Sequence, residues 1–202
     1  MIAIIDYGMG NIHSVNKALE LQGAKTIVSN KSKEILSAEK IVLPGVGAFD
    51  DAMEELKKKD LIYCILEVIK NGKPFLGICL GMQILFETSE EAKETKGLGV
   101  FKGSVKRFKE DKGIKVPHMG WNQLSKIADN CPLMNGVPDK SFVYFCHSYY
   151  PLPKDNKLVS TTTEYGINFA SSVWQGNVFG MQFHPEKSQE IGLKMINNFV
   201  NL

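Results

Sequence analysis

The first half of the chain alternates short apolar runs with longer segments of helical periodicity. The apolar runs, expected as strands, span residues 2–6, 26–29, 40–43 and 74–78, and the helical segments span 12–21, 49–69 and the residues from Leu80 onward. Alternation of this kind is typical of parallel strands joined by crossover helices. The first half therefore predicts an α/β fold with an open, mostly parallel sheet flanked by helices.

The second half has a different pattern, in which strand-like pieces are joined by tight turns. The pieces span residues 101–108, 141–149, 158–163, 169–174 and 177–183. Gly166 and Gly176 stand in dipeptides typical of hairpin turns. We expect these strands to be antiparallel additions to the same sheet, followed by a closing helix over 189–200.

The composition suits one globular domain spanning residues 1–202. Of the 202 residues 44% are hydrophobic, enough to bury a core without disulfides. The formal net charge of +2 does not indicate a nucleic-acid partner. No apolar segment is long enough to cross a membrane, and the four cysteines show no paired spacing and follow no secretory signal. A reduced, cytoplasmic setting is therefore expected.

Cys79 stands where a strand pattern meets a helix pattern, with a glycine two residues to either side. Gly77 and Gly81 would let the backbone turn sharply, leaving the thiol pointing out at the turn. A helix over about 80–87 would direct its positive end toward the sulfur and favour the thiolate. A lone cysteine is more often a small buried hydrophobe, so this interpretation depends on finding partners for Cys79.

The segment after the last predicted strand offers those partners. His184 is followed by Pro185, which disfavours helix, and residues two apart in an extended segment project to the same side. Glu186 can therefore orient the His184 imidazole. A single histidine beside a strand is more often structural, but thiol, imidazole and carboxylate together supply the nucleophile, base and orienting group of acyl transfer.

The G-x-C-x-G run around Cys79 and the H-P-E run at 184–186 resemble those of triad-type class I glutamine amidotransferases, over essentially the whole chain. The resemblance implies a flavodoxin-like sheet and glutamine as the ammonia donor. It makes Cys79 the nucleophile, His184 the general base and acid, and Glu186 the orienting carboxylate. Neither a metal nor an organic cofactor is expected, since His13, His118 and the scattered cysteines show no metal-ligand spacing.

The same resemblance suggests how glutamine is held. Backbone amides of Leu80, at the expected helix start, and Val46, in the turn after a neighbouring strand, are expected to form the oxyanion hole. The residues implied to contact glutamine are Gly47, Gln83, Ser148 and Tyr149. Cys146 is expected as an ordinary core residue.

Four runs, at 6–11, 44–47, 117–122 and 147–149, resemble the glutaminase subunits of imidazole glycerol phosphate synthases in particular. That likeness implies a heterodimer with a (β/α)₈ cyclase, which would use the ammonia to make imidazole glycerol phosphate and aminoimidazole carboxamide ribonucleotide in histidine biosynthesis. The residues expected at the interface are Met9, Asn11, Trp121, Asn122 and Lys187. Trp121 is equally well explained as a core anchor.

Three other functions remain open from the sequence. The chain could be the glutaminase of another synthase, in pyridoxal phosphate, anthranilate or purine synthesis. It could be a cysteine peptidase on a similar sheet, although the His184–Glu186 spacing disfavours this. It could also be a non-catalytic module that only regulates a synthase. Hydrolysis of glutamine without peptide cleavage would separate these functions.

Overall fold

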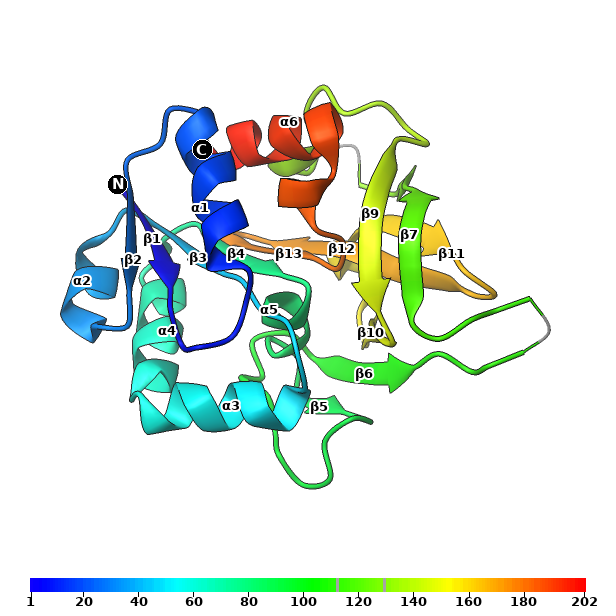
Figure 1. Cartoon of the computed structure of the whole chain (residues 1–202), viewed down its shortest axis with the longest axis horizontal. Coiled ribbons are helices and arrows are strands. Elements are labelled where there is room, and N and C mark those ends of the chain that lie inside the picture. Colours follow the sequence, from blue (N-terminus) through cyan, green and yellow to red (C-terminus); the bar gives the residue numbers. More distant parts are fainter. Residues whose placement is uncertain (112, 129) are drawn as a thin grey trace.

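The structure, a computed structural model, describes residues 1–111, 113–128 and 130–202, and is built on an eight-stranded central sheet (Figure 1). In spatial order its strands are β2 (Thr26–Ser29), β1 (Ile2–Ile5), β3 (Lys40–Leu43), β4 (Phe75–Ile78), β13 (Val178–Met181), β12 (Asn168–Gln175), β11 (Val159–Glu164) and β8 (Ser125–Lys126). The first five are parallel and the last three antiparallel. The parallel part has the flavodoxin-like order, with β13 as its fifth strand, which confirms the predicted fold class.

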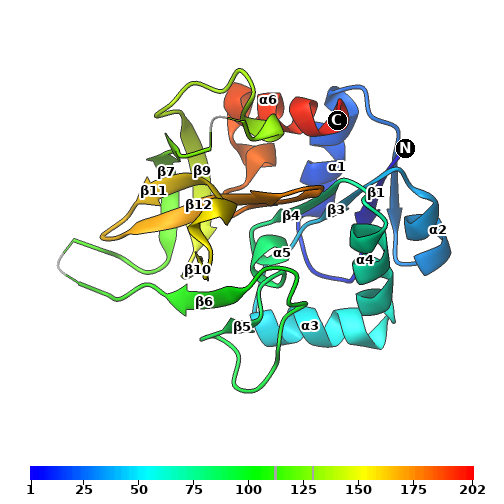
Figure 2. The same cartoon turned by 180° about the vertical axis from the view of Figure 1, so that it is seen from behind.

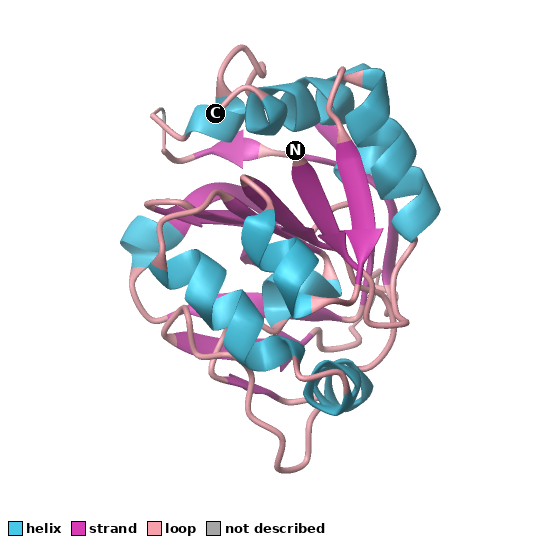
Figure 3. Cartoon of the chain, turned by 90° about the vertical axis from the view of Figure 1, so that its left-hand side faces the viewer, coloured by secondary structure: helices cyan, strands magenta, loops and turns pink. Residues whose placement is uncertain are grey.

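Helices cover both faces of the parallel part (Figure 3). On one face lie α1 (Ile12–Leu21) and α6 (Gln189–Val200), and on the other lie α2 (Ser32–Ser37), α3 (Phe49–Lys58) and α4 (Leu61–Lys70). Ile2 and Ile4 pack into the core beneath α1 and α6, whereas Ala3 and Ile5 pack into the core beneath α2, α3 and α4. Because both faces of β1 are buried, that strand is apolar throughout instead of alternating with polar residues.

Two small sheets stand beside the central one, at the end away from the N-terminus (Figures 1 and 2). One contains β10 (Tyr149–Pro153), β6 (Gly103–Arg107) and β5 (Thr88–Ser89), and the other pairs β7 (His118–Gln123) with β9 (Phe142–His147). The prediction that all second-half strands join the central sheet antiparallel is therefore wrong for β6 and β9, and β13 pairs parallel with β4. The reason is that a period-2 pattern identifies an extended segment without identifying its pairing partner.

The helix predicted over 49–69 is two helices. Asp60 separates α3 from α4 in a left-handed conformation, with φ 54° and ψ 33°. Each helix buries its own apolar stripe against the sheet, so the chain must change direction between them. By contrast, α1 and α6 have the predicted bounds. The remaining helical turns are α5 (Leu80–Gln83), η1 (Pro132–Met134), η2 (Asn156–Leu158) and η3 (Pro185–Lys187).

Candidate active site

Cys79 lies at the carboxyl end of β4, in a sharp turn into α5. Its φ of 54° and ψ of −111° are unusual for a residue with a side chain, and strain of this kind is held by tight surroundings. A Cβ on Gly81 would lie 1.9 Å from the Leu43 carbonyl oxygen, and one on Gly77 would lie 2.5 Å from the Gly81 carbonyl oxygen. As the glycine spacing predicts, the turn brings backbone segments so close together that neither position has room for a side chain.

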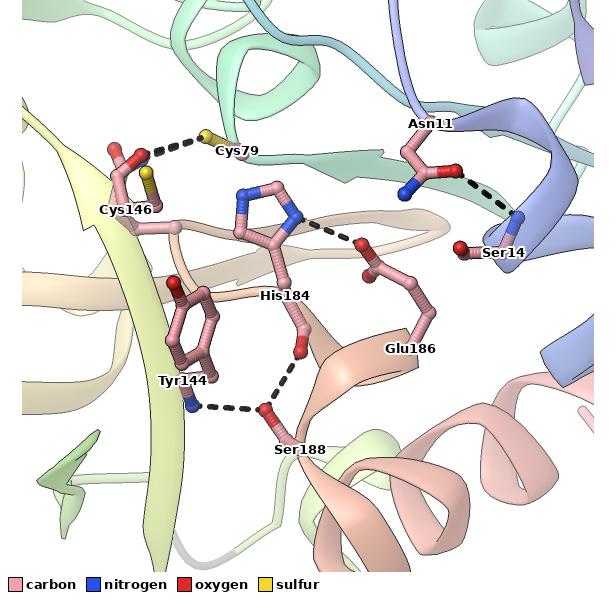
Figure 4. A network of polar contacts seen from close by, with 9 residues as sticks. Asn11, Ser14, Cys79, Tyr144, Cys146, His184, Glu186 and Ser188 are labelled. Carbon is pink, nitrogen blue, oxygen red and sulfur yellow. Dashed lines mark hydrogen bonds and ion pairs between the residues drawn. The ribbon is translucent and has the colours of Figure 1, made fainter. Parts of the chain in front are cut away.

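His184 and Glu186 follow β13, the strand adjacent to β4. The His184 amide donates to the Tyr144 carbonyl at 2.9 Å, and η3 then turns Glu186 back toward the ring. Glu186 Oε1 lies 2.8 Å from His184 Nδ1, with side-chain exposures of only 1% and 4%. Figure 4 shows the imidazole between the Cys79 thiol and the Glu186 carboxylate. The structure thus brings the three predicted catalytic residues together.

The environment of His184 favours its protonated form. Burial acts against the imidazolium, but hydrogen bonds and charge attraction from Cys79 and Glu186 outweigh it and raise the pKa of His184 to about 10. Nδ1–H then donates to Glu186, and the second ring nitrogen can donate to sulfur. An imidazolium beside the sulfur stabilises the thiolate, which is the reactive form of a cysteine.

This pairing predicts a stability loss at alkaline pH. The pKa of His184 is about 10 when folded and about 6.5 when unfolded, so the folded state holds a proton that the unfolded state releases between these values. The contribution is fully present below pH 6.5 and is lost as the pH rises toward 10. We expect Glu186→Gln to flatten that part of the curve in urea unfolding measured from pH 6 to 10. A decline of equal size in the variant would contradict the pairing.

A pocket of about 290 Å³ opens at Cys79. The predicted site residues that line it are Val46, Gly47, Cys79, Leu80, Gln83, Ser148, Tyr149, His184 and Lys187. The structure therefore gathers the predicted oxyanion and glutamine residues around the predicted nucleophile. Cys146 also lines the pocket and is half-buried, so its expected place in the core is wrong.

The turn at 44–47 packs directly on the start of α5. A Cβ on Gly45 would lie 2.9 Å from the Gly81 amide nitrogen, and Gly47 has a φ of 103° that only glycine adopts readily. Helix α5 ends at Gln83, earlier than predicted. The carbonyls that would continue it, those of residues 84–86, instead accept from the amides of residues 98, 99 and 101. The helix that directs its positive end toward Cys79 is therefore only four residues long.

Three groups at the Cys79 thiol or in the pocket were not found from the sequence. Gln182 donates from Nε2 to Cys79 Sγ at 3.6 Å and accepts from Gln83 Nε2 at 2.9 Å; its position two residues before His184 was the available signal. Glu91 accepts from the Phe49 amide at 2.9 Å, and burial raises the pKa of this carboxyl. His147 also lines the pocket. No sequence pattern distinguished Glu91 from other loop acids.

The residues predicted at a partner interface come from different elements of the fold. Trp121 on β7 is 46% exposed, so it is not a core anchor, and Lys187 is exposed with its Nζ 5.9 Å from the Tyr144 ring centroid. Asn122 alternates to the other face of β7, where Nδ2 donates to the Glu164 carbonyl at 2.9 Å. The remaining two predicted residues, Met9 and Asn11, lie before and at the start of α1.

Two further observations apply to the described part of the chain. Within residues 1–111, 113–128 and 130–202, no three His, Cys, Asp or Glu side chains gather as metal ligands. Over the same ranges, no helix has the length and apolar character needed to cross a membrane.

Comparisons with known proteins agree with this geometry. Residues 3–202 match the family model described as "Glutamine amidotransferase class-I". The chain is 50% identical to imidazole glycerol phosphate synthase subunit HisH of Thermosynechococcus vestitus, covering 100% of this chain and 96% of that protein. It is 53% identical to the HisH subunit of Bacillus cereus, covering 98% and 93%.

A solved structure supports the fold. The structure of PurLQS from Thermotoga maritima superposes with a TM-score of 0.76 at 22% identity, covering 99% of this chain and 97% of that one. At such low identity this likeness concerns the fold, whereas the full-length relatives at about half identity decide the family. The chain belongs to the class I glutamine amidotransferases and, among them, to the HisH subunits of imidazole glycerol phosphate synthase.

Proposed function

We propose that residues 1–202 act as one glutaminase domain that hydrolyses glutamine through a thioester on Cys79 and delivers the ammonia to a (β/α)₈ cyclase in histidine biosynthesis. The observation that carries this proposal is the contact of His184 with both the thiol and the buried Glu186 at the edge of one pocket. The four cysteines are free, which suits a reducing cytoplasm.

The reaction follows from the groups in the pocket. The Cys79 thiolate attacks the carboxamide carbon of glutamine, and the carbonyl electrons move onto oxygen. His184 donates its proton to the nitrogen, the carbon–nitrogen bond breaks and ammonia leaves, which forms the thioester. Water then gives its proton to His184 and attacks the thioester, releasing glutamate and restoring the thiolate.

Backbone amides are proposed to stabilise the two oxyanions. The amide of Leu80 starts α5 and has no partner within the helix, and Val46 lies in the turn that packs on the same helix start. Both residues border the pocket. A single donor of this kind contributes about 3 kcal/mol to transition-state stabilisation.

The polar groups of the pocket match the polar ends of glutamine. The Glu91 carboxylate is proposed to hold the α-ammonium group, whose charge it complements. Both amide hydrogens of Gln83 are already used, one by the Tyr149 carbonyl at 3.0 Å and one by Gln182. Its oxygen is therefore the acceptor that Gln83 offers to glutamine. Gly47 and Ser148 are proposed as further contacts on the two pocket walls.

The outer face of the β7–β9 pair is proposed as the main cyclase contact. Its docking surface consists of Met119, Trp121, Phe142 and Tyr144, where the first three are exposed and Trp121 lies edge-on to Tyr144. Exposed aromatic and methionine side chains are typical of interface centres. Lys187 joins this surface to the pocket, and Met9 and Asn11 are proposed at its margin. Asn122 supports the surface from behind.

The test is glutamate release from glutamine, measured for the chain alone and with the cyclase and its ribonucleotide ligand. We expect low activity alone and strong stimulation by the ligand-bound cyclase, because hydrolysis without an acceptor would waste glutamine. Trp121→Ala should weaken the complex by at least about tenfold in Kd. Tyr63→Ala is the matched control, since Tyr63 is 75% exposed on α4, far from β7 (Figure 1).

Each other outcome has a definite meaning. Equal rates with and without the cyclase would contradict the proposed coupling but keep the chemistry. No glutamate under any condition would leave a regulatory module, and cleavage of peptides would indicate a peptidase.

A further inference from the structure

Two buried histidines, His118 and His147, form a pair beside the pocket, which His147 borders, and the chemistry described above does not use them. His118 Nδ1 lies 3.1 Å from His147 Nε2, in a cage of aromatic rings. Tyr165 and Phe145 stack on the two sides of His118, with ring centroids at 3.9 and 4.7 Å. The pair is nearly inaccessible to solvent and joins β7 to the last residue of β9.

Main-chain carbonyls at both ends fix the direction of every hydrogen bond in this pair. The Tyr149 carbonyl can only accept, so His147 Nδ1, at 2.7 Å, must carry a hydrogen. A neutral His147 then has a bare Nε2, so His118 must donate to it from Nδ1. At the other end Asn122 Nδ2 donates to the Glu164 carbonyl and lies 3.3 Å from the bare His118 Nε2. Each donor thus meets an acceptor only when both rings are neutral with hydrogen on Nδ1.

The end of this chain of hydrogen bonds reaches the pocket. The Tyr149 carbonyl accepts from His147 on one side and from Gln83 Nε2 on the other, at 3.0 Å. Gln83 in turn donates to Gln182, whose own amide donates to Cys79 Sγ. Residue 148, between His147 and Tyr149, is where the chain passes from the β7–β9 pair to the β10 sheet. The imidazole of His147 therefore holds this crossing in one conformation.

We propose that His118 and His147 are positioning residues, a relay that fixes the Tyr149 carbonyl and through it the orientation of the Gln83 amide toward bound glutamine. The proposal rests on the glutaminase function proposed above. Neither histidine exchanges a proton with the substrate. Their contribution is to present Gln83 with its oxygen free and both its hydrogens used.

The surroundings of the pair keep both rings neutral. Burial lowers the pKa of His118 to about 4, and burial together with the charges of His118 and His184 lowers the pKa of His147 to about 3, against the opposing Tyr149 bond. The titratable groups that face the pair are Tyr165 on His118 and His184 near His147; the other neighbours are Phe108, Phe145 and Phe169. Protonation of either ring would leave two hydrogen-bond donors facing each other with no acceptor between them.

Imidazole nitrogen NMR on the whole chain tests the hydrogen positions without requiring activity. We expect both His118 and His147 to be neutral and protonated on Nδ1 from pH 8 to pH 5. Hydrogen on Nε2 of either ring, or titration of either ring above pH 6, would overturn the relay.

Kinetics with the cyclase complex test the positioning role. His147→Leu removes the donor to Tyr149, whereas His147→Asn places an amide nitrogen where Nδ1 was. We expect His147→Leu to raise the KM for glutamine about tenfold with kcat changed less than about threefold, and His147→Asn to restore most of the loss. Equal KM values for the two variants would overturn the proposal.

A second variant covers the case in which His147→Leu does not fold. His118→Phe keeps the aromatic packing, lies outside the pocket lining and removes the donor to His147. It should raise KM in the same direction, because the His147 ring loses the donor that holds its Nε2. An unchanged KM would count against the relay. If the unaltered complex releases no glutamate, the proposed function fails, and the tautomers then decide whether the hydrogen-bonded pair exists.

Discussion

Cys79→Ala is expected to lower the rate of glutamine hydrolysis by about five orders of magnitude, because Cys79 is the pocket thiol that contacts His184. The variant should still fold, since alanine keeps the Cβ that the strained turn accommodates. The measurement is glutamate release by the cyclase complex, with thermal unfolding recorded in parallel.

Cys146→Ala is the matched control for this experiment. Cys146 lines the same pocket, and its main-chain carbonyl lies 4.0 Å from Cys79 Sγ, so the substitution changes the second pocket thiol and leaves that carbonyl in place. We expect its activity to stay within about threefold of the unaltered protein. If the two variants lost activity equally, the assignment of Cys79 as the nucleophile would be untenable.

Gly81→Ala is expected to destabilise the fold by at least about 3 kcal/mol, lowering Tm by about 10 °C. Its Cβ would lie 1.9 Å from the Leu43 carbonyl oxygen, so the clash is between backbone segments and no side-chain rotation relieves it. Moving α5 away from β3 to make room would also displace Cys79. Activity should therefore fall even at temperatures where the variant is folded.

Gly99→Ala separates steric from conformational effects. Gly99 has a φ of 65°, and a Cβ there would meet nothing within 4 Å. We expect this variant to lose only about 1 kcal/mol, from the left-handed backbone conformation, and to keep its activity. Equal unfolding free energies for the Gly81 and Gly99 variants, in urea at neutral pH, would show that the contact at Leu43 is not tight.

The parallel half of the fold could be predicted because its signals are local. Strands buried on both faces are continuously apolar, and amphipathic helices such as α1 and α6 carry one apolar stripe, so their bounds follow from residue order. The G-x-C-x-G spacing likewise predicts the sharp turn at Cys79. Each of the two glycines stands where another backbone segment comes too close for a side chain.

The side sheets could not be predicted because strand pairing is a property of the whole fold. Nothing near β9 indicates that its partner is β7, or that Asn122 and Trp121 take opposite faces of that pair. The same limit applies to the site. Gln182 reaches the Cys79 sulfur and Glu91 reaches the pocket through contacts with distant segments, and the His118–His147 pair exists only because β7 and β9 meet.

The placement of β13 beside β4 has an evolutionary consequence. The nucleophile follows one of these neighbouring strands and the histidine follows the other, and the Cys79 amide donates to the Met181 carbonyl at 2.7 Å across the seam between them. The residues between 84 and 177 leave this seam and return to it, forming β8, β11 and β12 of the central sheet, both side sheets and the proposed docking surface on the way. Cys79 and His184 lie outside that excursion, and the pairing of β4 with β13 that sets their spacing does not depend on the length of the loops within it. A chain built this way can acquire a new acceptor enzyme while its ammonia-releasing chemistry stays intact.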